Sequence, residues 1–338
     1  MSRCLELAVK GIGTVFPNPM VGAVLVHEGR IIGEGYHEQY GKAHAEVNCI
    51  NSVKEEDRNF IANSTMYVSL EPCAHHGKTP PCADLLIAND IKHVVVGSGD
   101  PNPLVAGRGV AKLLQAGIEV TEHVMQEECD FVNRRFMTFH THHRPYIILK
   151  WAQSADGFFA PEDARQLWLT NEYSKKLVHR WRTEEDAILV GTRTALIDDP
   201  QLTARLWEGR NPVRILIDLD LKVPAESRIF DEEAMTLVYN TKKEGLELGT
   251  AYIKINRNEG IPLQIASDLY YRKIQSVIIE GGAYTINQFI DAGLWDEARI
   301  FTSPALLSSG ISAPQVGGHI SDEQKILDDS LIIKYKNG

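Results

Sequence analysis

The sequence predicts an α/β protein built from two domains. Short apolar runs typical of buried strands alternate with segments of helical spacing along most of the chain. At 338 residues, the chain is longer than one hydrophobic core usually organises. A polar segment, residues 127–144, separates two such alternating halves. We therefore expect one domain over residues 1–144 and a second over residues 145–338.

The first half reads as a compact three-layer α/β domain. A short amphipathic helix is expected over 3–10, and the Pro-rich segment FPNPM at 16–20 ends it. A β-hairpin follows, with strands at 21–26 and 30–37. The remaining elements expected in this half are a helix at 44–56, a strand at 65–73, a helix at 81–90, a strand at 93–100, a helix at 109–118 and a short strand at 118–120.

The second half starts a new alternation at residue 145. Its longest expected helix covers residues 171–185, and a double glycine at 281–282 separates a strand from a helix. The strands expected here cover 145–157, 187–191, 213–219, 236–240, 276–282 and 298–304, with a second helix at 283–294.

Charge and composition exclude several classes of function. With 35 basic and 45 acidic residues, the formal net charge is −10, which disfavours a surface built to bind nucleic acid. No apolar run approaches the roughly 20 residues that span a bilayer, so no membrane partner is expected. The first residues lack a signal-peptide core, which predicts a cytoplasmic protein. Five cysteines are too few, and odd in number, for a disulfide framework.

One constellation of residues indicates zinc chemistry. His44 and Glu46 form an H-x-E segment, and Cys73 and Cys82 each follow a proline. One imidazole and two thiolates would leave the fourth position of a tetrahedral zinc ion open to water, as in catalytic sites. A nearby carboxylate that is not a ligand can then carry protons, and we assign this role to Glu46.

Two other interpretations of these residues stay open. The cysteines could be buried thiols that pack as small hydrophobic side chains, although the two prolines and the shared H-x-E segment favour a metal site. A closed structural zinc site would need a fourth protein ligand, for which His75 and His76 are available. The other thiols, Cys4, Cys49 and Cys129, have no paired spacing and are expected to pack in the core or at the surface.

Long motifs in the first half resemble the deaminase part of the RibD family, the bifunctional deaminase–reductases of riboflavin biosynthesis. They are PNPMVGAVLV at 17–26, GYHEQYGKAHAE at 35–46, EPCAHHGKTPPC at 71–82 and DPNPLVAGRG at 100–109. The eight residues between the two cysteines depart from the P-C-x-x-C of nucleoside-type deaminases, and they match the spacing of this family.

The second half resembles the reductase part of the same family. The matching segments are KWAQSADG at 150–157, WLT at 168–170, HRWR at 179–182, DAILVGTRTALIDDPQLTAR at 186–205 and EGG at 280–282. Gln153 and the segment APEDARQ at 160–166 depart from the commoner family pattern.

The resemblance implies a fold and two consecutive reactions. The first domain would have a cytidine-deaminase-like fold and the second a dihydrofolate-reductase-like fold. The zinc-dependent deaminase would remove the C2 amino group of 2,5-diamino-6-ribosylamino-4(3H)-pyrimidinone 5′-phosphate. The reductase would then use NADPH to give 5-amino-6-ribitylamino-uracil 5′-phosphate. A homo-oligomer is also implied.

The resemblance also implies contacts for individual residues. In the deaminase, the residues expected to bind the pyrimidine ribotide phosphate are Asn18, His37, Lys78, Asp100 and Asn102. In the reductase, the residues expected to bind substrate are Lys150, Gln166, Arg182, Leu202, Arg205 and Glu280. The residues expected to contact NADPH are Gln153, Trp168, Thr170, Thr194, Asp198, Gly281 and Gly282.

Three rival functions make different demands on the sequence. A deaminase-only chain would have lost the phosphate-binding arginines of the second half, but Arg182 and Arg205 are present. A nucleic-acid deaminase needs a basic groove with stacking aromatic side chains, which the acidic balance disfavours. A purely structural zinc module would use four protein ligands and would not depend on Glu46 for activity.

Overall fold

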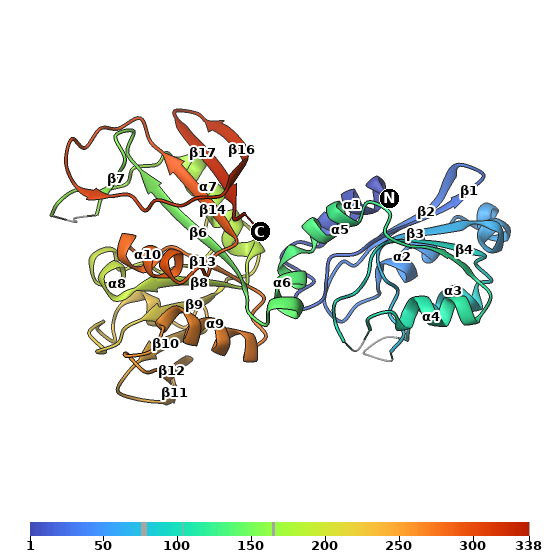
Figure 1. Ribbon diagram of the computed structural model, residues 1–338, viewed down its shortest axis with the longest axis horizontal. Coiled ribbons are helices and arrows are strands. Elements are labelled where there is room, and N and C mark those ends of the chain that lie inside the picture. The colour runs from blue at the N-terminus through green and yellow to red at the C-terminus, as the bar shows by residue number, and fades with distance from the viewer. Residues whose placement is uncertain (76–79, 104, 164–165, 338) are drawn as a thin grey trace. The chain divides into compact units, whose positions relative to one another are not determined.

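The chain folds into two compact units, Met1–His143 and Arg144–Gly338. The computed structural model describes residues 1–75, 80–103, 105–163 and 166–337 (Figure 1). Within these residues, no helix has both the length and the apolar character needed to cross a membrane.

The first unit contains the hairpin and the helix–strand alternation expected from the sequence. Its helices are α1 (Ser2–Ala8), α2 (Ala45–Asn51), α3 (Cys82–Ala88), α4 (Arg108–Gln115), α5 (Gln126–Val132) and α6 (Arg134–His142), with 3-10 turns at Val9–Gly11 and Glu55–Asn63. Its strands are β1 (Gly22–His27), β2 (Arg30–Tyr36), β3 (Thr65–Leu70), β4 (His93–Ser98) and β5 (Glu119–Thr121).

These elements form three layers around one sheet. Within the described residues the strand order is β2-β1-β3-β4-β5, with β3, β4 and β5 parallel (Figure 1). Side chains alternate between the two faces, as strand geometry requires. Ala23 and Leu25 of β1 pack in the core with α2, α3 and α4, whereas Val24 packs with Cys4 and Leu7 of α1 on the other face. The three-layer α/β architecture is therefore confirmed for this unit.

The helix after the hairpin is shorter than the sequence predicts. The sequence predicts a helix over 44–56, but α2 ends at Asn51 and a separate 3-10 turn follows. The Ser52 hydroxyl donates to the carbonyl of Cys49 (2.7 Å) and accepts from the backbone N–H of Glu34 (2.8 Å). Such a side-chain bond to the backbone competes with helix continuation, and here it also ties the helix end to β2.

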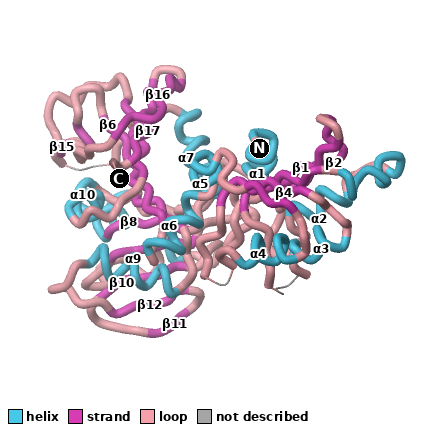
Figure 2. The backbone as a smooth tube through the Cα atoms, turned by 45° about the vertical axis from the view of Figure 1, so that its right-hand side comes forward, coloured by secondary structure: helices cyan, strands magenta, loops and turns pink. Residues whose placement is uncertain are grey.

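The second unit is organised around a larger mixed sheet (Figure 2). The strands of this unit are β6 (Tyr146–Gln153), β7 (Phe158–Ala160), β8 (Ala187–Gly191), β9 (Val213–Ile217), β10 (Thr236–Asn240), β11 (Gly245–Glu247), β12 (Thr250–Lys254), β13 (Ser276–Ile279), β14 (Glu297–Thr302), β15 (Ile311–Ser312), β16 (His319–Ile326) and β17 (Asp329–Tyr335). Strands β7 and β15 pair with each other in a separate two-stranded sheet. The helices of this unit are α7 (Glu172–Glu184), α8 (Thr192–Asp198), α9 (Ile261–Tyr271) and α10 (Ala283–Asp291), with a 3-10 turn at Arg228–Phe230.

Helices cover both faces of this sheet. Within the described residues the order is β11-β12-β10-β9-β8-β13-β6-β14-β17-β16, parallel from β12 to β14 and antiparallel at both edges. Ile265 of α9 and Phe289 of α10 pack on one face, and Trp181 of α7 packs on the other. The carboxyl ends of β6, β8, β9 and β13 therefore meet at one edge, where open parallel sheets bind their ligands.

Candidate active sites

Three side chains from three different elements converge in the first unit. His44 precedes the first residue of α2, Cys73 follows β3, and Cys82 is the first residue of α3. His44 Nδ1 lies 3.5 Å from Cys73 Sγ and 3.3 Å from Cys82 Sγ. Among the described residues, this is the group of histidine, cysteine and acidic side chains whose donor atoms are close enough to share one metal ion.

The spacing of these donor atoms fits a zinc ion. A tetrahedral zinc at ordinary bond lengths separates a nitrogen and a sulfur ligand by about 3.5 Å. The hydrogen bond with the Cys82 thiol lowers the pKa of Cys73, while the same contact and burial raise the pKa of Cys82. These opposite shifts disfavour ionisation of both thiols together, and a divalent cation would allow both to ionise.

Glu46 is the second residue of α2, the helix that follows His44, and it is almost completely buried, with an exposed fraction of 3%. Burial raises the pKa of its carboxyl group, and the nearby charge of Cys73 raises it further. A buried carboxyl group beside a donor cluster, and outside that cluster, is suited to accept and return a proton. The H-x-E segment thus places the carboxyl group of Glu46 beside the donor cluster that includes His44.

Asn18 and His37 lie next to this cluster and bond to each other. Asn18 Nδ2 is 3.1 Å from His37 Nε2, and His37 Nδ1 is 3.0 Å from the carbonyl oxygen of Ala43. Because the carbonyl can only accept, Nδ1 carries the proton and Nε2 accepts from Asn18. The His37 ring, 2% exposed, also packs edge-on against His44, with ring centroids 5.3 Å apart. His37 thus orients Asn18.

The loop after β4 carries two further expected residues. Asp100 Oδ1 accepts from the backbone N–H of Asn102 (2.8 Å). Burial raises the pKa of Asp100 to about 6, and the charges of Glu71 and Cys73 add to the shift. Asp100 is therefore close to the donor cluster. Glu71, a buried acid that the sequence reasoning missed, contacts the same loop. Lys78 and His76 lie outside the described residues.

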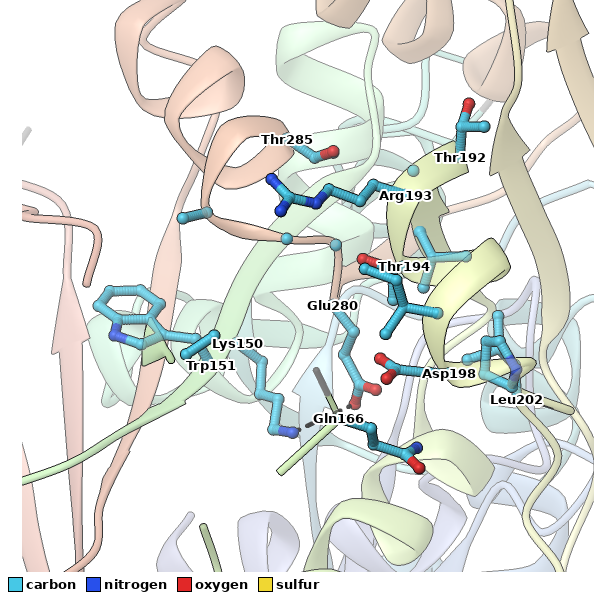
Figure 3. Close-up of a pocket in the computed structure, with 18 of the residues that line it drawn as sticks. Lys150, Trp151, Gln166, Thr192, Arg193, Thr194, Asp198, Leu202, Glu280 and Thr285 are labelled. Atoms are coloured by element: carbon cyan, nitrogen blue, oxygen red, sulfur yellow. Dashed lines mark ion pairs between the residues drawn. The ribbon is translucent and has the colours of Figure 1, made fainter. Parts of the chain in front are cut away.

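The second unit has a large cavity at the carboxyl ends of its parallel strands (Figure 3). Its volume is about 890 Å³, within the range of cofactor and substrate sites. The expected residues that line it are Lys150, Gln166, Trp168, Thr170, Arg182, Thr194, Asp198, Leu202, Arg205, Glu280, Gly281 and Gly282. Gln153 is not in this lining, and its side-chain oxygen accepts from the indole N–H of Trp151 (2.9 Å).

A buried ion network lies on one wall of the cavity. Arg182 Nη2 contacts Glu280 Oε2 at 3.0 Å, and Lys150 Nζ lies 3.8 Å from Glu280 Oε1. Burial works to raise the pKa of Glu280, but Lys150 and Arg182 outweigh it and lower that pKa. Among the described atoms, Glu280 Oε1 and Arg182 Nε are buried without a hydrogen-bond partner. Such orphaned groups are costly unless a ligand satisfies them.

Arg205 faces the same end of the cavity. Burial lowers its pKa, and repulsion from Arg182 lowers it further. Among the described residues, Arg205 has no ion pair, whereas Arg182 is held by Glu280. Two guanidinium groups so placed form a site for an anion such as a phosphate group.

Arg193 is a cavity residue that the sequence reasoning missed. It lies in the first turn of α8, and its guanidinium group points across the cavity toward Thr285 of α10 (Figure 3). It has no ion pair with the described part of the chain. The resemblance points to its neighbour Thr194, but a single arginine in an ordinary helical turn carries no signal of its own.

His179, also missed, lines the cavity one turn before Arg182 and supports a pH prediction. Burial lowers the pKa of His179 to about 4, assisted by the positive charges of Arg182 and Arg205. A depressed histidine pKa contributes stability that is complete above about pH 6.5 and is lost as pH falls toward about 4. We expect His179→Gln to remove up to about 3 kcal/mol of this pH-dependent stability. Urea unfolding of both proteins between pH 7 and pH 4 measures it, and parallel pH profiles would contradict it.

Comparisons with known proteins identify both halves. Residues 1–98 match the family described as cytidine and deoxycytidylate deaminase zinc-binding region, and residues 145–325 match the RibD C-terminal domain. The chain is 41% identical to the riboflavin biosynthesis protein RibD of Aquifex aeolicus, over 99% of this chain and 97% of the relative. It is 36% identical to that of Escherichia coli, over 91% and 88% of the two chains.

Solved structures agree over the full length. A deaminase–reductase from Thermotoga maritima is 37% identical with a TM-score of 0.90, covering 99% of this chain and 97% of that one. RibD of Acinetobacter baumannii is 30% identical with a TM-score of 0.89, covering 100% and 98%. The two-part fold class expected from the resemblance is confirmed, with a deaminase-like first half and a RibD reductase second half. The chain therefore belongs to the RibD family, the bifunctional deaminases and reductases of riboflavin biosynthesis.

Proposed function

We propose that the two sites act on one pyrimidine ribotide phosphate in sequence. The first unit removes the C2 amino group of 2,5-diamino-6-ribosylamino-4(3H)-pyrimidinone 5′-phosphate by hydrolysis. The second reduces the ribosyl group of the product to ribityl, giving 5-amino-6-ribitylamino-uracil 5′-phosphate. The printed name of the Thermotoga maritima relative, a diaminohydroxyphosphoribosylaminopyrimidine deaminase and 5-amino-6-(5-phosphoribosylamino)uracil reductase, supports this pair of reactions.

The observation that carries the deaminase proposal is the donor cluster beside a buried carboxyl group. His44, Cys73 and Cys82 would hold one zinc ion, which when bound makes water nucleophilic near neutral pH. Glu46 would take the proton from that water and deliver it to the ring nitrogen and the departing ammonia. Asn18, with its Nδ2 occupied by His37, would present its Oδ1 to a donor on the pyrimidine.

Metal content tests this assignment directly. We expect one zinc per chain in the wild type, and less than a tenth of that in Cys82→Ser, because a hydroxyl group is a poor zinc ligand. Cys49→Ser is the matched control, since Cys49 is equally buried but not part of the cluster. Atomic absorption measures both variants. Full zinc content in Cys82→Ser would refute the assignment.

In the second unit, the reacting sugar would lie beside Lys150, Asp198 and Glu280, which all line the cavity. A bound NADPH supplies the hydride for C1′ of the ribosyl group. As the C1′–O4′ bond breaks, O4′ needs a proton. Burial raises the pKa of Asp198, which favours its holding a proton to donate. Figure 3 shows Asp198 and Glu280 turned toward the part of the cavity that Lys150 reaches.

The remaining cavity residues would hold the ends of the two ligands. Arg205, with Arg182 and the backbone at Leu202, would bind the substrate phosphate, and Gln166 would contact the same molecule. Gly281 and Gly282 precede α10, and their lack of side chains would let cofactor phosphates approach the backbone. Arg193 supports this, because its charge, which has no ion pair among the described residues, lies across from that turn. Trp168, Thr170 and Thr194 would complete the NADPH contacts.

The homo-oligomeric state implied by the sequence stays a prediction, as does the cytoplasmic location. Analytical ultracentrifugation of the purified full chain tests the first. A single monomer species at micromolar concentration would contradict it.

A further inference from the structure

The carboxylate of Glu71, the residue directly after β3, accepts hydrogen bonds from four backbone N–H groups. Its side chain is almost completely buried, and its Oε1 accepts from the backbone N–H groups of Gly109 (2.8 Å) and Val110 (3.3 Å). Its Oε2 accepts from the N–H of Gly107 (2.9 Å) and, at 3.4 Å, from that of Asp100. One carboxylate therefore binds the backbone both at Asp100, just after β4, and at Gly107, just before α4.

Three of these donors, the N–H groups of Gly107, Gly109 and Val110, lie at the start of α4. Gly107 caps the helix with a left-handed φ of 72°, and no side chain from the helix itself caps it. The first N–H groups of a helix have no partner inside it, and an anion there is favourable. Glu71 supplies that partner from the position directly after β3, so the start of α4 and the end of β3 are fixed to each other.

Close packing reinforces the same junction. A Cβ atom at position 109 would lie only 1.8 Å from the carbonyl oxygen of Pro72. Position 109 must therefore be glycine while α4 contacts the segment that leads into Cys73. The backbone N–H of Glu71 also donates to the carbonyl of Ser98 at the end of β4 (2.9 Å). Glu71, two residues before Cys73, is thus bonded to the end of β4 and to Asp100 in the loop that also bears Asn102.

We propose that Glu71 is a positioning residue of the deaminase, which fixes the backbone at Asp100 and Gly107 against the Cys73 segment so that Asp100 and Asn102 can bind the pyrimidine substrate. The inference rests on the proposed deaminase function. It assigns no zinc contact to Glu71, because both its oxygens are occupied by backbone donors.

The variant Glu71→Gln tests this role at nearly constant volume. A glutamine has one acceptor oxygen, and its NH2 group would face N–H donors with which it cannot bond. We expect the KM for the diaminopyrimidine phosphate to rise at least tenfold and kcat to fall less than threefold. Zinc content and the rate of reduction of the deaminated substrate should match the wild type. Glu71→Asp, which keeps the charge on a shorter side chain, should give an intermediate KM.

Hydrogen exchange provides a readout that does not depend on activity. The amides of Gly107, Gly109 and Val110 should exchange at least tenfold faster in Glu71→Gln. Asp84→Asn is the matched control, because Asp84 pairs with Lys112 of α4 (2.5 Å) without touching the loop. It should leave both the KM and these amides unchanged.

Each outcome decides between the alternatives. An unchanged KM in Glu71→Gln would overturn the inference, as would a kcat loss with unchanged KM. Loss of zinc would instead make Glu71 a support of the metal site and would also overturn it. If Glu71→Gln fails to fold, as judged by circular dichroism and by the thermal unfolding transition of the first unit, the shorter acid decides: a wild-type KM in Glu71→Asp would refute the role. Absence of deamination by the wild type would refute the proposed function itself.

Discussion

Replacement of Glu46 by glutamine is expected to abolish ammonia release while leaving the metal site intact. The amide keeps the size of the side chain but cannot carry a proton, and general acid–base catalysis contributes about 10²- to 10⁴-fold. Glu46 is not in the donor cluster of His44, Cys73 and Cys82, so zinc should remain at one per chain. Ammonia release from the diaminopyrimidine phosphate measures the first effect, and atomic absorption the second.

The second half of the molecule is the internal control for this variant. Reduction of the deaminated substrate should proceed at the wild-type rate, because the reductase cavity lies wholly within the other unit. Zinc loss in Glu46→Gln would show that the carboxylate belongs to the metal site. Activity within tenfold of the wild type would show that another group moves the proton.

The largest effect in the reductase is expected from Arg205. Arg205→Gln removes the guanidinium group that lacks an ion pair with the described residues, and charge-assisted hydrogen bonds contribute about 1.5–3 kcal/mol. The KM for the deaminated ribotide should therefore rise roughly 10- to 150-fold, with a smaller change in kcat. Steady-state NADPH oxidation at varied substrate concentration measures both.

A substrate without the phosphate group makes this test specific. If Arg205 binds the phosphate, the wild type and Arg205→Gln should reduce the dephosphorylated compound equally poorly. Arg180→Gln is the matched control, because Arg180 belongs to the same unit but pairs with Glu184 on the surface of α7. A similar loss with both compounds would assign Arg205 to the sugar or the cofactor.

Local patterns in the sequence are sufficient to predict the elements that carry the deaminase chemistry. The apolar run at 21–26 and the turn that follows it place β1 and β2 correctly, and the prolines before Cys82 mark the start of α3. The residue types of His44, Glu46, Cys73 and Cys82 indicate zinc chemistry without any knowledge of the fold.

Other features depend on contacts that the local sequence does not encode. The sequence does not predict strand β16, because as an edge strand it is largely exposed and its sequence HISDEQKI lacks an apolar run. Glu71 acts through backbone N–H groups more than 25 residues away, which leave no trace in residue type. The resemblance places Gln153 at the cofactor, and this contact stays a prediction; in β6 its side chain accepts from the indole N–H of Trp151.

The order of the two reactions is tested most directly by one coupled assay. The purified full chain is given the diaminopyrimidine phosphate, with and without NADPH, while ammonia and NADPH are followed together. We expect ammonia release at the same initial rate in both cases, and NADPH oxidation only after a lag, reaching one NADPH per ammonia. Oxidation of NADPH ahead of ammonia release, or no ammonia at all, would contradict the assignment of the two sites.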